Sequence, residues 1–188
     1  MVEFPVQTLE SAPEKSRATL EAVQSRIGML PNMFGVLANS PAVVNAYAAM
    51  QGALADSGLT QAEQQVSILA IAAENGCTYC VPAHTMAAAK AGLDDAHIEA
   101  LRDGRDLDDP KLNALKEFAL TVVRKRGRVD DTEIDAFLKA GFRDTDILDV
   151  ILTAAMKTIT NYTNHIAHVP LDEAFEPKRW EDPAEAAE

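Results

Sequence analysis

The sequence predicts an all-α protein, and two observations support that prediction. Hydrophobic residues make up 47% of the 188 residues but aromatic residues only 5%, a balance that favours helices over a β-sandwich. Apolar residues also recur at helical spacing between clear stop and start signals such as Gly28, Gly58 and Pro110. A chain of this length can bury one core, so we expect residues 1–188 to form a single helical domain.

The stop and start signals give the order of the expected helices. The expected segments are 12–27, 30–38, 42–57, 60–73, a helix from about 78, a short helix ending near 101, and then 110–126, 131–140 and 144–162. Thr60 and Glu63 have the spacing of a capping box at the start of the 60–73 helix, whose apolar run predicts burial on most sides. The acidic tail after about residue 176 is expected to be extended.

Two similar segments suggest an internal duplication of a helical unit. They lie 83 residues apart: Gly58-Leu59-Thr60 with Ile68, Leu69 and Ala72, and Gly141-Phe142-Arg143 with Ile151, Leu152 and Ala155. The match is short and rich in alanine, so chance similarity remains the alternative.

The two cysteines of the chain lie close together, with a histidine four residues after the second, in the segment NGCTYCVPAHTMA at 75–87. Residues three and four apart share one face of a helix, so Cys77 and Cys80 could approach closely enough for a disulfide. His84 could lie one turn beyond Cys80, as a charged neighbour or a proton relay. This spacing indicates redox chemistry.

The residues around the cysteines predict where a helix begins. Asn75-Gly76 is a chain breaker, Thr78 can act as an N-cap, and Pro82 is tolerated only in a first turn. The new helix should therefore place Cys80 at its amino end. The unpaired N–H groups and the helix dipole there favour the thiolate, which is the reactive form of cysteine.

Three other interpretations of the cysteines remain open. Free cysteines pack as small hydrophobic residues in many proteins. Cys77, Cys80 and His84 could also bind zinc, but no fourth ligand is evident, so we expect no metal and no cofactor. A structural disulfide would need an oxidising compartment, whereas the N-terminal segment does not resemble a signal peptide, and we expect a cytoplasmic protein.

Charge and hydropathy exclude two classes of partner. The net charge of -12 argues against a nucleic-acid surface. No apolar stretch approaches the roughly 18 residues that a membrane span requires.

The run from Asn75 to His84 resembles the CxxCxxxH signature of the AhpD-like alkylhydroperoxidases in the carboxymuconolactone decarboxylase superfamily. Two further segments, Leu30-Pro31-Asn32-Met33-Phe34 and Asn161-Tyr162-Thr163-Asn164-His165, resemble its peroxidase-related subgroup. The resemblance implies an AhpD-like helical fold and a homo-oligomer.

The resemblance also implies a mechanism and a set of partners. Cys80 would attack hydrogen peroxide or an organic hydroperoxide and become a sulfenic acid, Cys77 would resolve it as a disulfide, and His84 would join a proton relay. A lipoyl-bearing or thioredoxin-like dithiol protein would reduce the disulfide, giving an antioxidant cycle.

One position departs from the family pattern. The relay normally includes a glutamate twelve residues before the first cysteine, where this chain has Gln65. A neutral amide cannot act as a general base, so either the activity is weaker or another acid substitutes. Glu74 and Glu63 are the candidates, and Glu63 ranks lower because a capping box already explains it.

Two alternative functions follow from the same residues. A carboxymuconolactone decarboxylase-like enzyme shares the fold without depending on a CxxC pair. A non-enzymatic thiol redox sensor would form the disulfide but turn over poorly, which the presence of Gln65 keeps open.

Overall fold

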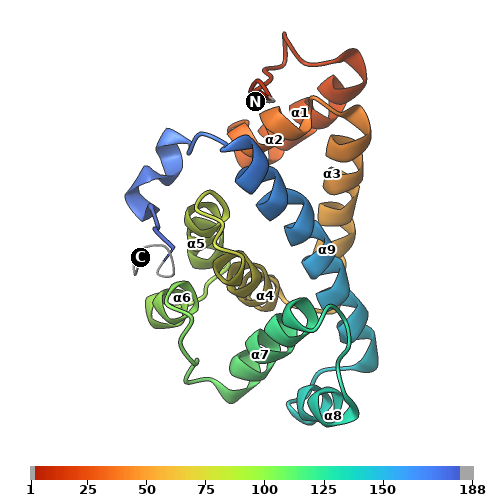
Figure 1. Ribbon diagram of the computed structural model, residues 1–188, viewed down its shortest axis with the longest axis vertical. Helices are drawn as coiled ribbons and strands as arrows, with labels where there is room; N and C mark the ends of the chain where they lie inside the picture. Colours follow the sequence, from red (N-terminus) through yellow and green to blue (C-terminus); the bar gives the residue numbers. More distant parts are fainter. Residues whose placement is uncertain (1–2, 183–188) are drawn as a thin grey trace.

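The protein is an all-helical assembly, seen in a computed structural model that describes residues 3–182 (Figure 1). Within that range every regular element is a helix: α1 (Glu14–Ile27), α2 (Asn32–Leu37), α3 (Pro41–Ala55), α4 (Gln61–Glu74), α5 (Cys80–Lys90), α6 (Asp95–Arg102), α7 (Pro110–Arg124), α8 (Asp131–Lys139), α9 (Asp144–Ala167) and the 3-10 helix η1 (Glu173–Lys178). The predicted all-α class is confirmed. No helix in this range is long and apolar enough to cross a membrane.

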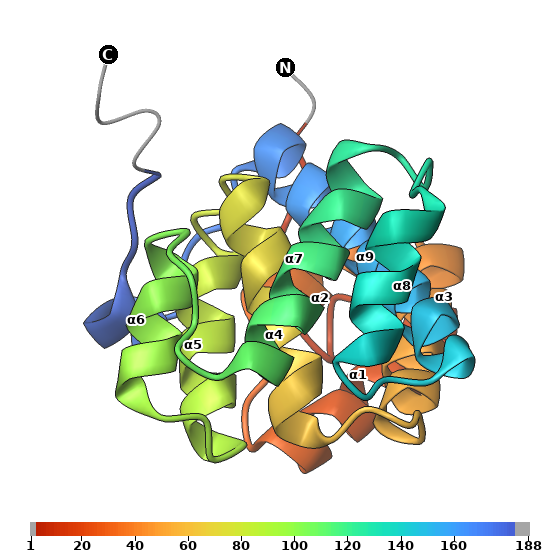
Figure 2. The same ribbon diagram turned by 90° about the horizontal axis from the view of Figure 1, so that it is seen from below.

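Helix α4 lies at the centre of the fold (Figure 2), where it packs against α5, α6, α7 and α9. Its residues from Val66 to Ala72 are all buried, so the prediction of burial on most sides is confirmed. The helix begins with the predicted capping box, in which the Thr60 hydroxyl accepts from the Glu63 amide at 3.2 Å. The Glu63 carboxylate in turn accepts from the Thr60 amide at 2.8 Å.

The chain breaks between α4 and α5 at Gly76, as predicted. Gly76 has a φ of +61°, and a Cβ atom at this position would collide with the Asp182 carboxylate. Helix α5 then begins at Cys80. The prediction that Thr78 caps it is wrong, because the Cys80 amide donates to the Cys77 sulfur at 3.3 Å and the exposed Thr78 hydroxyl makes no cap bond.

Helix α9 is longer than predicted, continuing to Ala167 instead of ending near Tyr162. Its start lies 83 residues after that of α4, and the Asp146 carboxylate accepts from the Arg143 amide at 2.7 Å, as Glu63 does from Thr60. This common start has the offset seen in the sequence. The duplication itself stays a prediction.

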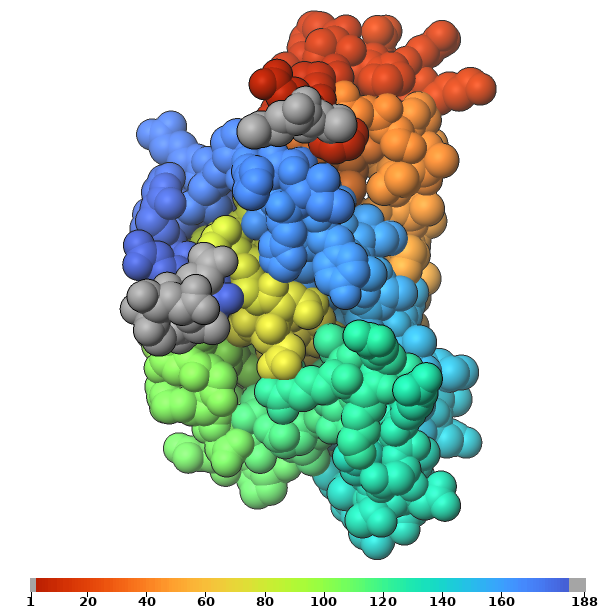
Figure 3. Space-filling model, viewed as in Figure 1, coloured from red at the N-terminus to blue at the C-terminus, as the bar shows by residue number. Residues whose placement is uncertain are grey.

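Residues 169–182, which we call the C-terminal strap, follow α9 and pack beside α5 and α6 (Figure 3). The Asp172 carboxylate accepts from the Asn32 amide at 3.2 Å, and the indole of the buried Trp180 donates to the Arg102 carbonyl at 3.1 Å. The strap therefore differs from the extended tail expected after residue 176, because η1 continues to Lys178 and Trp180 anchors the segment. Residues 183–188 lie outside the described residues.

Candidate dithiol site

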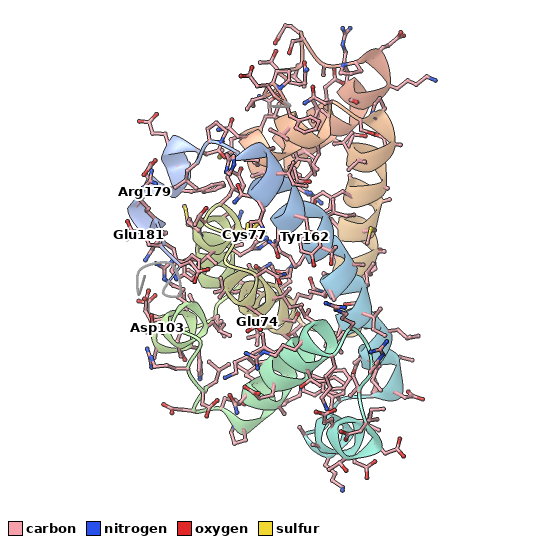
Figure 4. The ribbon with its side chains drawn as sticks, viewed as in Figure 1. Glu74, Cys77, Asp103, Tyr162, Arg179 and Glu181 are labelled. Atoms are coloured by element: carbon pink, nitrogen blue, oxygen red, sulfur yellow. The ribbon has the colours of Figure 1, made fainter. Side chains whose placement is uncertain are left out.

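The two cysteines come together at the start of α5, which is the arrangement that their spacing predicts. Cys77 is fully buried and Cys80 is 3% exposed, and both are free thiols. The 3.3 Å bond from the Cys80 amide to the Cys77 sulfur holds the two residues in a single turn. In Figure 4, Cys77 lies between α9, which carries Tyr162, and the strap, which carries Arg179 and Glu181.

Helix α9 presents a buried polar face to this turn. The Asn75 amide donates to the Asn161 side-chain oxygen at 2.9 Å, and the Asn164 amide donates to the Thr78 hydroxyl at 3.4 Å. Lys157 lies one turn before Asn161 and is only 1% exposed. Its ammonium and the Asn161 side-chain nitrogen have no hydrogen-bond partner among the described residues.

The surroundings of the two thiols separate their pKa values. Burial opposes ionisation of Cys80, but the Cys77 thiol, the positive charge of Lys157, the Thr160 hydroxyl and the Asn161 amide together lower its pKa to about 6. Burial raises the pKa of Cys77, and a negative sulfur on Cys80 raises it further. At neutral pH the site therefore holds a thiolate on Cys80 and a protonated thiol on Cys77.

Sequence reasoning missed Lys157, although its charge acts on the whole site. Burial disfavours the ammonium, but the sulfur of Cys80 and the phenol of Tyr47, followed by Cys77, raise the pKa of Lys157 above its ordinary value. The one available signal was a lysine on the same helical stripe as Val150 and Thr153, which are buried. No short motif includes it.

His84 and Gln65 also come together, with 3.0 Å between His84 Nδ1 and Gln65 Oε1. Burial and the charge of Lys157 lower the pKa of His84 well below its usual value, so the ring is neutral. Because a carbonyl oxygen only accepts, His84 Nδ1 carries the proton in this contact and Nε2 is the acceptor nitrogen. The amide of Gln65 orients the imidazole but cannot remove a proton from it.

The two candidate substitute acids make contacts elsewhere. Glu74 forms an ion pair with Arg124 of α7, with N to O distances of 2.7 and 2.6 Å. Glu63 belongs to the capping box and also accepts from Lys111 at 2.7 Å. Within residues 3–182, no group of three or more His, Cys, Asp or Glu side chains is arranged to hold a metal ion.

A helical fold with a buried CxxC pair at a helix start defines a class of dithiol proteins, and comparison with known families places the chain within it. The model of the carboxymuconolactone decarboxylase family matches residues 41–119. The structure of a peroxidase-related protein from Ralstonia eutropha, described as an alkylhydroperoxidase AhpD core, is 28% identical with a TM-score of 0.82. The alignment covers 92% of this chain and 93% of that one. The chain belongs to the carboxymuconolactone decarboxylase superfamily and has the AhpD-like fold.

Two further structures share the fold at lower identity. A peroxidase-related protein from a Silicibacter species is 22% identical with a TM-score of 0.78, covering 93% of this chain and 92% of that one. The debrominase Bmp8 in complex with 2,3,4-tribromopyrrole is 13% identical with a TM-score of 0.73, covering 94% and 95%. The fold thus occurs with more than one chemistry. None of the curated proteins compared with the chain matches it.

Proposed function

We propose that this protein is a thiol-dependent peroxidase that reduces hydrogen peroxide or organic hydroperoxides through a Cys77 and Cys80 dithiol cycle. The observation that carries the proposal is the pairing of a low-pKa thiol at Cys80 with a protonated thiol at Cys77 in one turn. Membership of the superfamily and the 28% identity to a peroxidase-related protein support it.

The proposed cycle has three steps. The Cys80 thiolate attacks one peroxide oxygen, the O–O bond breaks, and the other oxygen leaves as alkoxide or hydroxide and takes up a proton. Cys80 is now a sulfenic acid. The Cys77 sulfur then attacks the Cys80 sulfur, the S–O bond breaks, and the hydroxide leaves with a proton as water. A dithiol reductant, which we propose to be a lipoyl-bearing or thioredoxin-like protein, returns two electrons and two protons to the disulfide.

Gln65 favours one second candidate, a redox sensor. Because the amide cannot accept a proton, a relay through His84 has no carboxylate at its end. A protein of this kind would form the disulfide readily and turn over slowly.

The test combines turnover with a thiol count. Hydrogen peroxide and an organic hydroperoxide are each supplied with dihydrolipoamide as reductant, and thiols are counted by mass spectrometry before and after one equivalent of peroxide. We expect loss of two thiols in the unmodified protein, a sulfenic acid at Cys80 in Cys77→Ser, and no turnover in Cys80→Ser.

The outcomes separate the candidates. Full turnover by Cys80→Ser would overturn the mechanism. One round of disulfide formation without turnover would identify a sensor, and an activity that survives complete alkylation of both thiols would point to the decarboxylase-like alternative.

A further inference from the structure

Lys157 is a buried charge without the partner that buried charges normally have. Its ammonium is 1% exposed and has no hydrogen-bond partner among residues 3–182, where no carboxylate forms an ion pair with it either. Charged side chains in protein interiors are costly unless they are paired. Lys116, the other buried lysine, is paired in this way: its ammonium lies 2.9 Å from both Asp106 and Glu117 and donates to the Arg105 carbonyl.

The ionisable groups around Lys157 share one property, which is that each is neutral until it loses a proton. They come from three elements: Tyr47 of α3, Cys77 from the turn before α5, and Cys80 and His84 of α5. None of them is a carboxylate. The charge on Lys157 can therefore be balanced only by an anion that the site itself produces, and Cys80 is the group that ionises most easily.

The contacts of α9 fix Lys157 to this site. Residues 157, 161 and 164 share one helical face, and two of them hold the cysteine turn through the bonds from Asn75 to Asn161 and from Asn164 to Thr78. Lys157 is thus carried on the same rigid helix that positions the dithiol.

We infer that Lys157 is the proton-holding partner of the dithiol: it is an ammonium while Cys80 is a thiolate, and it gives up one proton when the Cys77 and Cys80 disulfide forms. The physical reason is that the disulfide is neutral. Once it forms, the buried ammonium has no anion beside it, and burial then favours the neutral amine.

The protons and electrons balance on this assignment. The reduced site holds a thiolate, a thiol and an ammonium, and the oxidised site holds a disulfide and an amine. Two electrons leave, together with one proton from Cys77 and one from Lys157. In the proposed peroxidase cycle these two protons are those taken up by the leaving oxygen and by the departing hydroxide, so Lys157 would supply the proton that Gln65 cannot relay.

The inference deepens the proposed function, but its test needs no peroxide. The dithiol is equilibrated with reduced and oxidised dithiothreitol from roughly pH 7 to 8, where the reference thiols remain mostly protonated and its couple exchanges two protons. If the protein also exchanges two protons, the equilibrium constant does not change with pH. If only Cys77 releases a proton, the constant changes tenfold per pH unit.

The ionisation of Cys80 is measured alongside, by thiolate absorbance and by the rate of alkylation. We expect a thiolate across this pH range together with a constant equilibrium. A thiolate with a tenfold change per pH unit would overturn the inference, and so would a Cys80 that remains protonated up to pH 8. A failure of peroxidase turnover would affect neither reading, so the two proposals fail separately.

Two variants extend the test to the side chain itself. In Lys157→Met we expect the pKa of Cys80 to rise by about 1 to 3 units, the range for loss of a nearby opposite charge. Lys116→Met removes an equally buried lysine from another site and should leave the pKa of Cys80 unchanged. Equal shifts in both variants would show a general structural effect and contradict the inference. If Lys157→Met fails to fold, the measurement on the unmodified protein decides the question.

Discussion

The hydroxyl of Tyr79 donates a 2.5 Å hydrogen bond to the carboxylate of Asp172, which ties the residue between the two cysteines to the C-terminal strap. The same hydroxyl accepts from the Met33 amide at 3.1 Å. Three segments that are distant in sequence thus meet at one oxygen atom beside the dithiol.

Removal of that oxygen should destabilise the protein without stopping its chemistry. In Tyr79→Phe, the buried Asp172 carboxylate loses a donor and the Met33 amide loses its acceptor, which should cost about 1 to 3 kcal/mol. Urea unfolding measures the loss. Peroxide turnover should persist, because the hydroxyl is not part of the proposed cycle. Tyr162→Phe is the matched control, since Tyr162 is 55% exposed, and a loss of similar size there would refute the interpretation.

Stability should rise with pH from about 6 towards the ordinary pKa of cysteine. The folded protein holds Cys80 at a pKa of about 6, whereas the unfolded chain holds it near 8.5. Between these values the unfolded state binds the extra proton, so the free energy of unfolding increases with pH by up to about 1.4 kcal/mol per unit. Chemical denaturation at several pH values measures the slope. Cys80→Ser should lose this contribution, and an identical slope in that variant would disprove the assignment.

A carboxylate at position 65 should change the protonation of His84. In Gln65→Glu the new anion would accept from His84 Nδ1 and should raise the pKa of the ring by about 1 to 3 units. Nuclear magnetic resonance titration of the imidazole reports this shift, and peroxide turnover should increase if the relay then operates. Gln61→Glu adds the same charge at an exposed position of α4 and should leave His84 unaffected. An unchanged His84 titration in Gln65→Glu would argue against their contact.

Gly76 should not tolerate a side chain. Gly76→Ala forces a left-handed conformation on alanine and drives its Cβ into Asp182, at a cost of at least about 1 to 2 kcal/mol. Gly52→Ala is the contrasting control, because Gly52 lies within α3 with open space around it, and there alanine should stabilise by about 0.5 to 1 kcal/mol. Thermal unfolding of the two variants should therefore shift in opposite directions. Equal behaviour would mean that the turn at Gly76 is less constrained than it is here.

Local signals were enough to predict much of the fold and part of the site. The capping box at Thr60, the apolar run of α4 and the break at Gly76 each act within a few residues, so the sequence shows them directly. The same signals place Cys80 at the first position of α5. The contact between Gln65 and His84 joins α4 to α5, and a family resemblance indicated those two residues together.

The features that were missed depend on contacts distant in sequence. Lys157 lies 77 residues after Cys80, in a helix that carries no motif, and its role arises only when α9 packs against the cysteine turn. The cap of α5 was misassigned because a sulfur atom accepts the bond that a hydroxyl was expected to accept. The anchoring of the strap depends on a single tryptophan finding the end of α6.

The strap gives the two halves of a redox cycle different physical barriers. It holds Gly76 and Tyr79, the residues that precede the two cysteines, while the sulfur atoms beneath are almost fully buried. A peroxide of a few atoms needs only small movements of side chains to reach Cys80. A reductant must align its own sulfur with the disulfide bond, which requires residues 169–182 to open locally. The lifetime of the oxidised protein is then set by the opening of one peptide segment, and the protein keeps a record of an encounter with oxidant for as long as that segment stays closed.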